Sequence, residues 1–301
     1  MTAHRGPGPG GADVVASTDG VTVALHDLGG DGPPLLLCHA TGFHGLIWAP
    51  LAAELDDVAH CWALDFRGHG DSALPSSGLL GWRRMADDVL AAAARVKGDA
   101  LFGVGHSMGG AALVLAEQAR PGLFSALWCF EPIIFPTGPA TARASAADGA
   151  EVPRPLPMAA SARRRKAVFP DRATALANYA AKPPLAGFAP EALEAYVEHG
   201  FRDLPDGGVE LKCAPETEAS VFEGGVDHGA FSRLGDVLCP ATIVASGDGR
   251  PPSQAARAMA DALPNGRFER LPALSHFGPM EDPVAIAQNI RASLFPTSTR
   301  R

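Results

Sequence analysis

Short apolar runs alternate with longer amphipathic stretches through the first 131 residues of the chain. The continuous apolar runs are typical of strands buried on both faces of a sheet, and they cover Pro34–His39, Cys61–Asp65, 100–105 and Ala126–Glu131. A weaker alternation over Val21–His26 predicts an outer strand. Apolar residues at helical spacing predict helices over Leu46–Leu55, Trp82–Val96 and Met108–Ala119. This rhythm predicts an α/β fold with a doubly wound, mostly parallel sheet and helices on both faces.

The alternation breaks at Pro132 and resumes about 100 residues later. Residues 136–235 are rich in proline and contain short helical stretches such as Arg172–Ala181 and Pro190–His199, so we interpret them as a helical cap. A strand over Ala241–Ser246, a helix over Pro252–Leu263 and a last strand over Arg267–Leu271 then complete the core. Asp282-Pro283 opens a C-terminal helix, with Asp as N-cap and Pro at the first helical position. We therefore expect a flexible tail over 1–18, a core over 19–135 and 236–301, and a cap over 136–235.

Composition narrows the function classes. With 301 residues, 47% of them apolar, the chain is long enough for one large domain with an insertion. A net charge of −8 argues against a nucleic-acid partner. The one basic run, Arg163-Arg164-Arg165-Lys166, is interpreted as a solvated helix face.

The expected location and cofactor content are inferred from membrane, signal and metal-ligand patterns that we do not find in the sequence. No apolar stretch approaches the roughly 20 residues that span a bilayer, and the Gly/Pro-rich start has no apolar segment of a signal peptide. The five cysteines show no metal-ligand spacing and are interpreted as free buried thiols in a reducing compartment. We expect a cytoplasmic protein without cofactor, metal or membrane partner, acting on a small-molecule substrate, with a homodimer left open.

Gly105-His106-Ser107-Met108-Gly109 lies between an expected strand and an expected helix and matches G-x-S-x-G. A serine at such a sharp turn is held in strained backbone, so its neighbours two residues away must be very small. The turn presents the hydroxyl above the sheet and directs the first helical N–H groups toward the place where an oxyanion would form. Ser107 is therefore the candidate nucleophile.

Four segments together give a resemblance to the α/β-hydrolase family. They are the strand that ends in His39-Ala40-Thr41-Gly42, the turn Phe66–Ser72, the motif Gly105–Gly109 and the loop Ser275-His276-Phe277-Gly278. The stretch from Leu211 to Ala219 in the expected cap is similar to a subgroup of small bacterial hydrolases. The resemblance implies a sheet of the α/β-hydrolase type and a nucleophile–acid–histidine set.

The resemblance implies His276 as the base, because the family carries it on the loop after the last strand. Met108 N–H is one oxyanion donor by position, and Thr41 N–H is the best candidate for the second, although Ala40 stands where the family usually has glycine. His106 is interpreted as structural, packed beneath the serine turn. We expect His39 to order its loop through backbone hydrogen bonds, and His228 to be either a pocket residue or a turn residue.

Two carboxylates compete for the role of the acid. The family's usual position after the strand before the last is occupied by Arg250, which cannot accept a hydrogen bond from the histidine, and Asp248 stands two residues earlier. Glu131 ends the strand after the nucleophile helix, and its separation from Ser107 resembles that in haloalkane dehalogenases of this fold. A carboxylate at the end of an apolar strand requires a partner, so we favour Glu131 over Asp248.

A serine nucleophile indicates acyl transfer and disfavours haloalkane dehalogenation, which uses a carboxylate nucleophile, and epoxide hydrolysis on the same ground. We expect a serine hydrolase that cleaves an ester-like or other acyl bond of a small, largely apolar substrate through an acyl-enzyme. A ligand-binding protein without catalysis, a cofactor-free perhydrolase and a C–C bond hydrolase are the alternatives. The expected pocket residues are Phe43, Phe135 and Met158.

Overall fold

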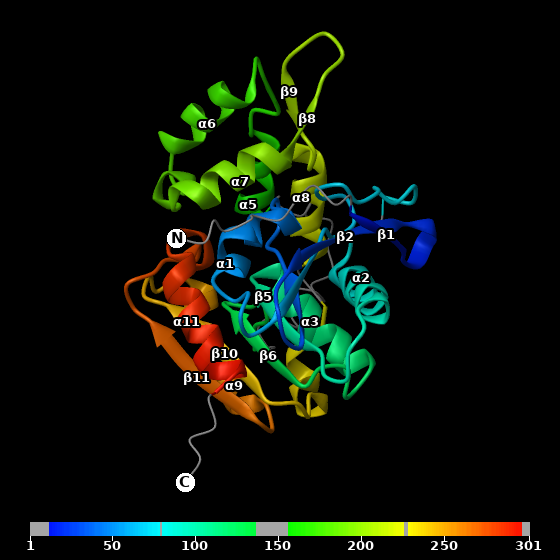
Figure 1. The fold of residues 1–301 in the computed structure, drawn as a ribbon, viewed down its shortest axis with the longest axis vertical. Coiled ribbons are helices and arrows are strands. Elements are labelled where there is room, and N and C mark those ends of the chain that lie inside the picture. The colour runs from blue at the N-terminus through cyan, green and yellow to red at the C-terminus, as the bar shows by residue number, and fades with distance from the viewer. Residues whose placement is uncertain (1–11, 79, 137–155, 226–227, 297–301) are drawn as a thin grey trace, which may run out of the picture.

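An eight-stranded sheet forms the centre of the computed structural model, which describes residues 12–78, 80–136, 156–225 and 228–296 (Figure 1). Its strand order is β1-β2-β4-β3-β5-β6-β10-β11. The strands are β1 (Asp13–Ala16), β2 (Thr22–Gly29), β3 (Pro34–Cys38), β4 (His60–Leu64), β5 (Phe102–His106), β6 (Ala126–Phe130), β10 (Ala241–Ser246) and β11 (Gly266–Leu271). β1 and β2 pair antiparallel, β2 and β4 likewise, and every other pair is parallel. The predicted α/β class with a mostly parallel sheet is confirmed.

Helices cover both faces of this sheet, because the central strands are apolar on both sides. One core contains residues of α2 (Trp82–Arg95), α3 (Met108–Ala119) and α9 (Pro251–Ala262). The other contains residues of α1 (Ala49–Ala53) and α11 (Pro283–Leu294). As predicted, α11 begins with an N-cap: Oδ1 of Asp282 accepts a hydrogen bond from the N–H of Ala285 at 2.9 Å. The remaining helical segments of the core are Thr18–Gly20, Gly45–Trp48, Phe231–Asp236 and α10 (Gly278–Glu281).

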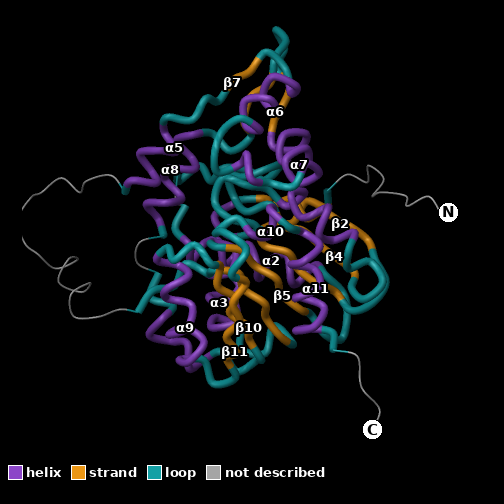
Figure 2. Tube along the Cα trace, turned by 90° about the vertical axis from the view of Figure 1, so that its left-hand side faces the viewer, coloured by secondary structure: helices purple, strands orange, loops and turns teal. Residues whose placement is uncertain are grey.

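The segment of residues 156–225, part of the chain between β6 and β10, stands at one end of the molecule, beyond one end of the strands of the large sheet, in both Figure 1 and Figure 2. Its helices are α5 (Pro157–Arg163), α6 (Arg172–Ala180), a short turn at Leu185–Gly187, α7 (Pro190–Gly200) and α8 (Pro215–Gly224). A three-stranded antiparallel sheet, not expected from the sequence, joins them with the order β7-β9-β8. Its strands are β7 (Val168–Phe169), β8 (Phe201–Asp203) and β9 (Val209–Leu211).

Two local expectations differ from the structure. Asp13–Ala16, counted as part of a flexible tail, pairs with β2 as β1; the rest of that tail up to residue 11 lies outside the described residues. The helix expected over Leu46–Leu55 is a 3-10 turn over Gly45–Trp48 followed by the short α1. Pro50 at the second position of α1 fixes where the α-helix begins, because proline is tolerated only in the first turn.

The five cysteines are free and buried, as expected. Burial raises the pKa of the Cys38 and Cys129 thiols above its ordinary value, so both remain protonated and unreactive. Within the described residues, none of the helices has both the length and the apolarity required to cross a bilayer.

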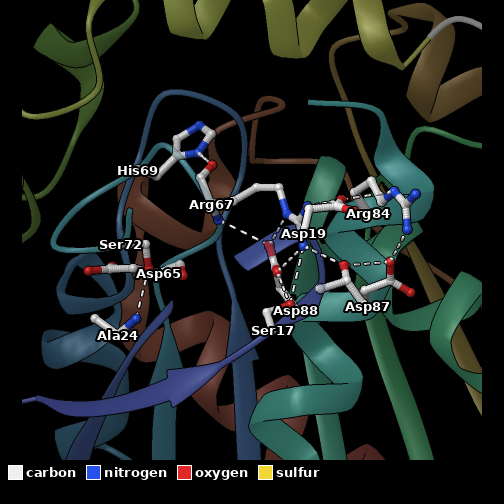
Figure 3. Close-up of polar contacts among 11 residues, drawn as sticks. Ser17, Asp19, Ala24, Asp65, Arg67, His69, Ser72, Arg84, Asp87 and Asp88 are labelled. Atoms are coloured by element: carbon white, nitrogen blue, oxygen red, sulfur yellow. Dashed lines mark hydrogen bonds and ion pairs between the residues drawn. The ribbon is translucent and has the colours of Figure 1, made fainter. Parts of the chain in front are cut away.

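A buried ion pair fixes the turn after β4 (Figure 3). Arg67 is fully buried, and its Nε and Nη2 donate to the two carboxylate oxygens of Asp88 on α2 at 2.9 and 2.6 Å. The same guanidinium contacts Asp19 and the hydroxyls of Ser17 and Thr18. This network connects the turn to α2 and to the segment between β1 and β2.

Candidate active site

Ser107 lies at the junction of β5 and α3 in a backbone conformation that side chains rarely adopt, with φ 56° and ψ −114°. Its N–H donates to the carbonyl of Phe130 at 3.0 Å. A Cβ on Gly105 would lie 2.6 Å from the backbone of Gly110, and one on Gly109 would lie 2.1 Å from the carbonyl oxygen of Cys38. Only glycine fits at both positions, which is the requirement inferred from the sequence motif.

His276, on the loop between β11 and α10, lies next to this serine. Its Nε2 is 3.2 Å from Oγ of Ser107. The backbone of His276 is held on both sides: its carbonyl accepts from Nε2 of His106 at 2.7 Å, and its N–H donates to Asp248 at 3.1 Å. Two independent contacts thus fix the position of the ring, whose side chain is 13% exposed.

Glu131, the first residue after β6, completes a line of contacts from Ser107 through His276. Its carboxylate is fully buried, and Oε2 lies 2.6 Å from Nδ1 of His276. Oε1 accepts from the N–H of Ser246, at the end of β10, at 2.7 Å. Glu131 has a φ of 44°, so this residue, like Ser107, is held in strained backbone.

Asp248, the alternative acid, does not contact the histidine ring in the described part of the chain. Its Oδ1 accepts from the Ser246 hydroxyl and the Arg250 N–H, both at 3.0 Å, while Oδ2 accepts from the backbone of His276. Burial raises the pKa of Asp248, but these hydrogen bonds lower it more, so the net shift is downward. The structure thus brings Glu131, and not Asp248, to the ring of His276, while the oxygens of Asp248 hold the backbone of the loop.

The side chains of the other candidate histidines form hydrogen bonds with backbone groups. His39 donates from Nδ1 to the carbonyl of Ala40 at 2.7 Å and accepts at Nε2 from the N–H of Phe66 at 3.1 Å, so it orders the loop as expected. His228 lies outside any helix or strand; its Nε2 is 2.9 Å from the carbonyl of Ile133, and its ring stacks on Trp82. His106 is fully buried, and burial, together with the neighbouring His276, holds its pKa well below the ordinary value. A neutral His106 donates from Nε2, as its contact with a carbonyl requires.

Thr41 and Met108 lie beside each other near the serine. Both are buried, and Oγ1 of Thr41 contacts Sδ of Met108 at 3.4 Å. Within the described residues, no protein acceptor takes the backbone N–H of either residue. One of these donors belongs to the loop after β3 and the other to the first residue of α3, and free backbone N–H groups are the kind of donor that an oxyanion site uses.

Aromatic rings line one side of the His106–His276 pair. Phe43 lies 6.3 Å from His106 and 6.2 Å from Phe277, measured between ring centroids. The sequence analysis named Phe43 but missed the rings around it, because their helical or loop spacing carries no distinguishing pattern; they are Phe188, Tyr196 and Phe277. Phe135 and Met158 are 42% and 56% exposed, and their place in a substrate pocket stays a prediction.

One cluster of metal-ligand residue types lies apart from the serine. Donor atoms of His26, Asp65 and Asp71 lie within 4.8 Å of one another. The Asp65 carboxylate already accepts from His26 and from the N–H groups of Gly45 and Asp71, and Asp71 pairs with Lys212 at 2.6 Å. These atoms are used in structural contacts, and the cluster stabilises the turn after β4.

A model of the alpha/beta hydrolase family matches residues 35–289. The chain belongs to this family. Curated relatives match about a third of this chain. Over 104 residues the chain is 36% identical to protein phosphatase methylesterase 1 of Mus musculus, and the match covers 33% of this chain and 27% of the relative. The corresponding match to the probable protein phosphatase methylesterase 1 of Caenorhabditis elegans is 34% over 110 residues, covering 35% and 30%. The matched region therefore spans less than a third of the length of these relatives.

Solved structures of the family share the fold over nearly the whole chain. E-2-(acetamidomethylene)succinate hydrolase superimposes with a TM-score of 0.75 at 21% identity, covering 93% of this chain and 98% of that one. A thermophilic esterase from Thermogutta terrifontis, with malate bound, gives 0.69 at 22% identity, covering 94% and 97%. At 21% and 22% identity, these similarities establish only the fold of this chain. Its chemistry must be inferred from its own side chains.

Proposed function

We propose that the protein is a serine hydrolase that cleaves a carboxylic ester, or a related acyl bond, of a small substrate through an acyl-enzyme on Ser107. The observation that carries this proposal is the line of contacts from Ser107 Oγ to His276 Nε2 at 3.2 Å and from His276 Nδ1 to Glu131 at 2.6 Å. A protein that only binds a ligand has no need of a buried carboxylate behind a histidine, since burying a charge is costly.

In the first half of the reaction Ser107 is the nucleophile, and His276 acts first as the base and then as the acid. Ser107 Oγ attacks the carbonyl carbon of the ester while its proton moves to Nε2 of His276. The carbonyl oxygen becomes an oxyanion, which accepts from the N–H groups of Met108 and Thr41. The C–O bond to the alcohol then breaks, and Nε2 returns the proton to the leaving oxygen. The products are an acyl-Ser107 ester and the free alcohol.

The second half repeats these steps with water. His276 accepts a proton from the water as its oxygen attacks the acyl carbon, and it then returns the proton to Ser107 Oγ as the acyl bond breaks. Glu131 stabilises the imidazolium in both halves and fixes the tautomer that has its hydrogen on Nδ1. The carboxylic acid leaves, and the serine hydroxyl is restored.

The segment between β6 and β10 supports the choice of a small substrate. It contributes Phe188 and Tyr196 to the aromatic wall around Phe43, which lies beside the serine turn. We propose that this segment acts as a cap that excludes water and so strengthens the hydrogen bonds to the oxyanion. The partial match to methylesterases is a further reason to begin with esters.

The test combines labelling and turnover. A fluorophosphonate probe should label Ser107, and the protein should hydrolyse members of an acyl-ester series of increasing chain length. Ser107→Ala should lose both properties while keeping its circular dichroism spectrum and melting temperature, because alanine fits the turn. Ser232→Ala, in the turn Phe231–Asp236, is the matched control and should keep both. Ester hydrolysis by Ser107→Ala near the parent rate would overturn the proposal.

A further inference from the structure

Arg165, part of the basic run interpreted as a solvated helix face, is largely buried. Its side chain is 20% exposed, and its guanidinium contacts the Glu218 carboxylate on α8. Nη2 also donates to the hydroxyl of Tyr179, at 3.3 Å, and to the hydroxyl of Tyr196. We refer to these four residues as the Arg165 cluster. Arg163 and Arg164, which precede it in the basic run, are exposed, so Arg165 differs from both in its burial.

The Arg165 cluster borders the oxyanion loop. A Cβ placed on Gly42 would lie 2.6 Å from Oε1 of Glu218, so this carboxylate contacts the backbone one residue after Thr41. The ring of Tyr196 lies 5.6 Å from that of Phe43, the next residue of the same loop. A charged pair from the segment between β6 and β10 is thus packed directly against the loop that supplies an oxyanion donor.

The cluster has hydrogen-bond donors beyond those it uses internally. The guanidinium offers five N–H donors in a planar fork and stays charged at any working pH. Among the described contacts only its Nη1 and Nη2 are engaged, which leaves the Nε hydrogen. Burial raises the pKa of the Tyr196 hydroxyl, so that this group keeps a proton to donate. A permanent cation with phenolic O–H groups beside it is suited to a carboxylate.

We propose that the Arg165 cluster is a subsite for a carboxylate group of the substrate, so that the substrate is an ester that also carries a free acid. This inference rests on the proposed function, since it places the subsite next to the Ser107 acyl site. Glu218 neutralises Arg165 while the subsite is empty, and an entering carboxylate shares the same guanidinium with it. The substrate acid and the Glu218 carboxylate therefore repel each other, and removing the charge of Glu218 should strengthen binding of the acid.

The test uses two pairs of esters that differ only in replacing a carboxylate by a methyl group. Monomethyl glutarate against methyl pentanoate has the acid on the acyl side, and 4-acetoxybutanoate against butyl acetate has it on the alcohol side. The parent protein should prefer the acid in at least one pair. Arg165→Met should reduce that preference about 10- to 100-fold, the value of hydrogen bonds to a charged group, because kcat/KM should fall far more for the acid than for the neutral ester.

Two further variants separate recognition from a structural role. Glu218→Gln keeps an acceptor for Nη1 but removes the charge, so it should raise the preference for the acid. Arg163→Met is the matched control: Arg163 is two residues away and pairs with Glu216 and Glu223, both at least 40% exposed. It should leave the preference unchanged. Equal loss for both esters in Arg165→Met, or no preference in the parent protein, would overturn the subsite.

A binding measurement keeps the result separate from turnover. Calorimetry of glutarate should show binding to the parent protein, tighter binding to Glu218→Gln and none to Arg165→Met. If no ester is hydrolysed, the proposed function fails, and these titrations alone decide the subsite. Should Arg165→Met not fold, Arg165→Lys replaces it. The lysine keeps the charge without the planar fork, so it should weaken glutarate binding; parent-like binding by Arg165→Lys in that case would overturn the proposal.

Discussion

Replacing Glu131 by glutamine tests the orientation of His276 with almost no change in shape. Glu131 Oε1 accepts from the N–H of Ser246 at 2.7 Å. An amide can keep that bond only with its oxygen, so its NH₂ group must then face Nδ1 of His276. Nδ1 has to become the acceptor, and the ring hydrogen moves to Nε2. In this tautomer Nε2 cannot take the proton of Ser107.

The size of the effect follows from the same geometry. In a Ser-His-Asp enzyme, an amide in place of the acid lowers kcat by about 10⁴ because the wrong tautomer forms. That factor corresponds to about 5.5 kcal/mol of activation free energy. We expect a loss of this order for Glu131→Gln, because both of its carboxylate oxygens already have fixed partners. Asp248→Asn is expected to lose only about 2- to 10-fold, since an asparagine oxygen can still accept from the backbone N–H of His276.

The assay is steady-state hydrolysis of the best ester of the acyl series, with melting temperature as the folding control. The two variants should differ by at least two orders of magnitude in kcat while both stay folded. The reasoning is refuted if Glu131→Gln keeps near-parent activity, and the opposite ranking would return the acid's role to Asp248.

Two predictions concern stability. Asp88→Asn leaves the buried Arg67 guanidinium with only the longer contact to the partly exposed Asp19 as its counter-charge. It should cost about 3 kcal/mol of unfolding free energy, whereas Asp87→Asn, in the partly exposed pair with Arg84, should cost less than about 1 kcal/mol. Equal losses in urea unfolding would contradict this difference. Burial lowers the pKa of His39 to about 3, and those of His44 and His69 to about 4. The unfolded chain then binds more protons below about pH 6.5, so stability should be complete above that pH and fall by up to about 1.4 kcal/mol per pH unit for each histidine toward pH 4. Urea unfolding at pH 7 and pH 5 measures this loss; His69→Gln should reduce it, and equal stabilities would refute it.

The elements that position the site could be predicted because their physical requirements are local. The short runs of β3, β5 and β6 are mostly apolar and buried on both faces, and the glycines around Ser107 are required by a single turn. Glu131 could be singled out because an acid at the end of a buried strand needs a partner. The partner itself, His276, is 145 residues away in the chain, and only the family resemblance pointed to it.

Other features have no local signal. β7 and β8 contain two and three residues, too few for an alternation to be recognised, and they exist because they pair with β9. Arg165 stands in a run of four basic residues, where exposure is the ordinary expectation. Its burial depends on Glu218, 53 residues further along the chain, and on two tyrosine hydroxyls. Long-range pairing decides both cases, and a single sequence does not display it.

The insertion lies in the sequence between β6, which Glu131 follows, and β10, which ends at Ser246. Ser107, Glu131, His276 and the Ser246 N–H all belong to the core, whereas Arg165, Glu218 and Tyr196 belong to the insertion. Under the proposed function, substitutions in the insertion can change which substrates are accepted while the contacts among Ser107, His276 and Glu131 stay within the core. The proposed function therefore assigns the chemistry and the choice of substrate to two different parts of one chain, and a change in one part need not alter the distances in the other.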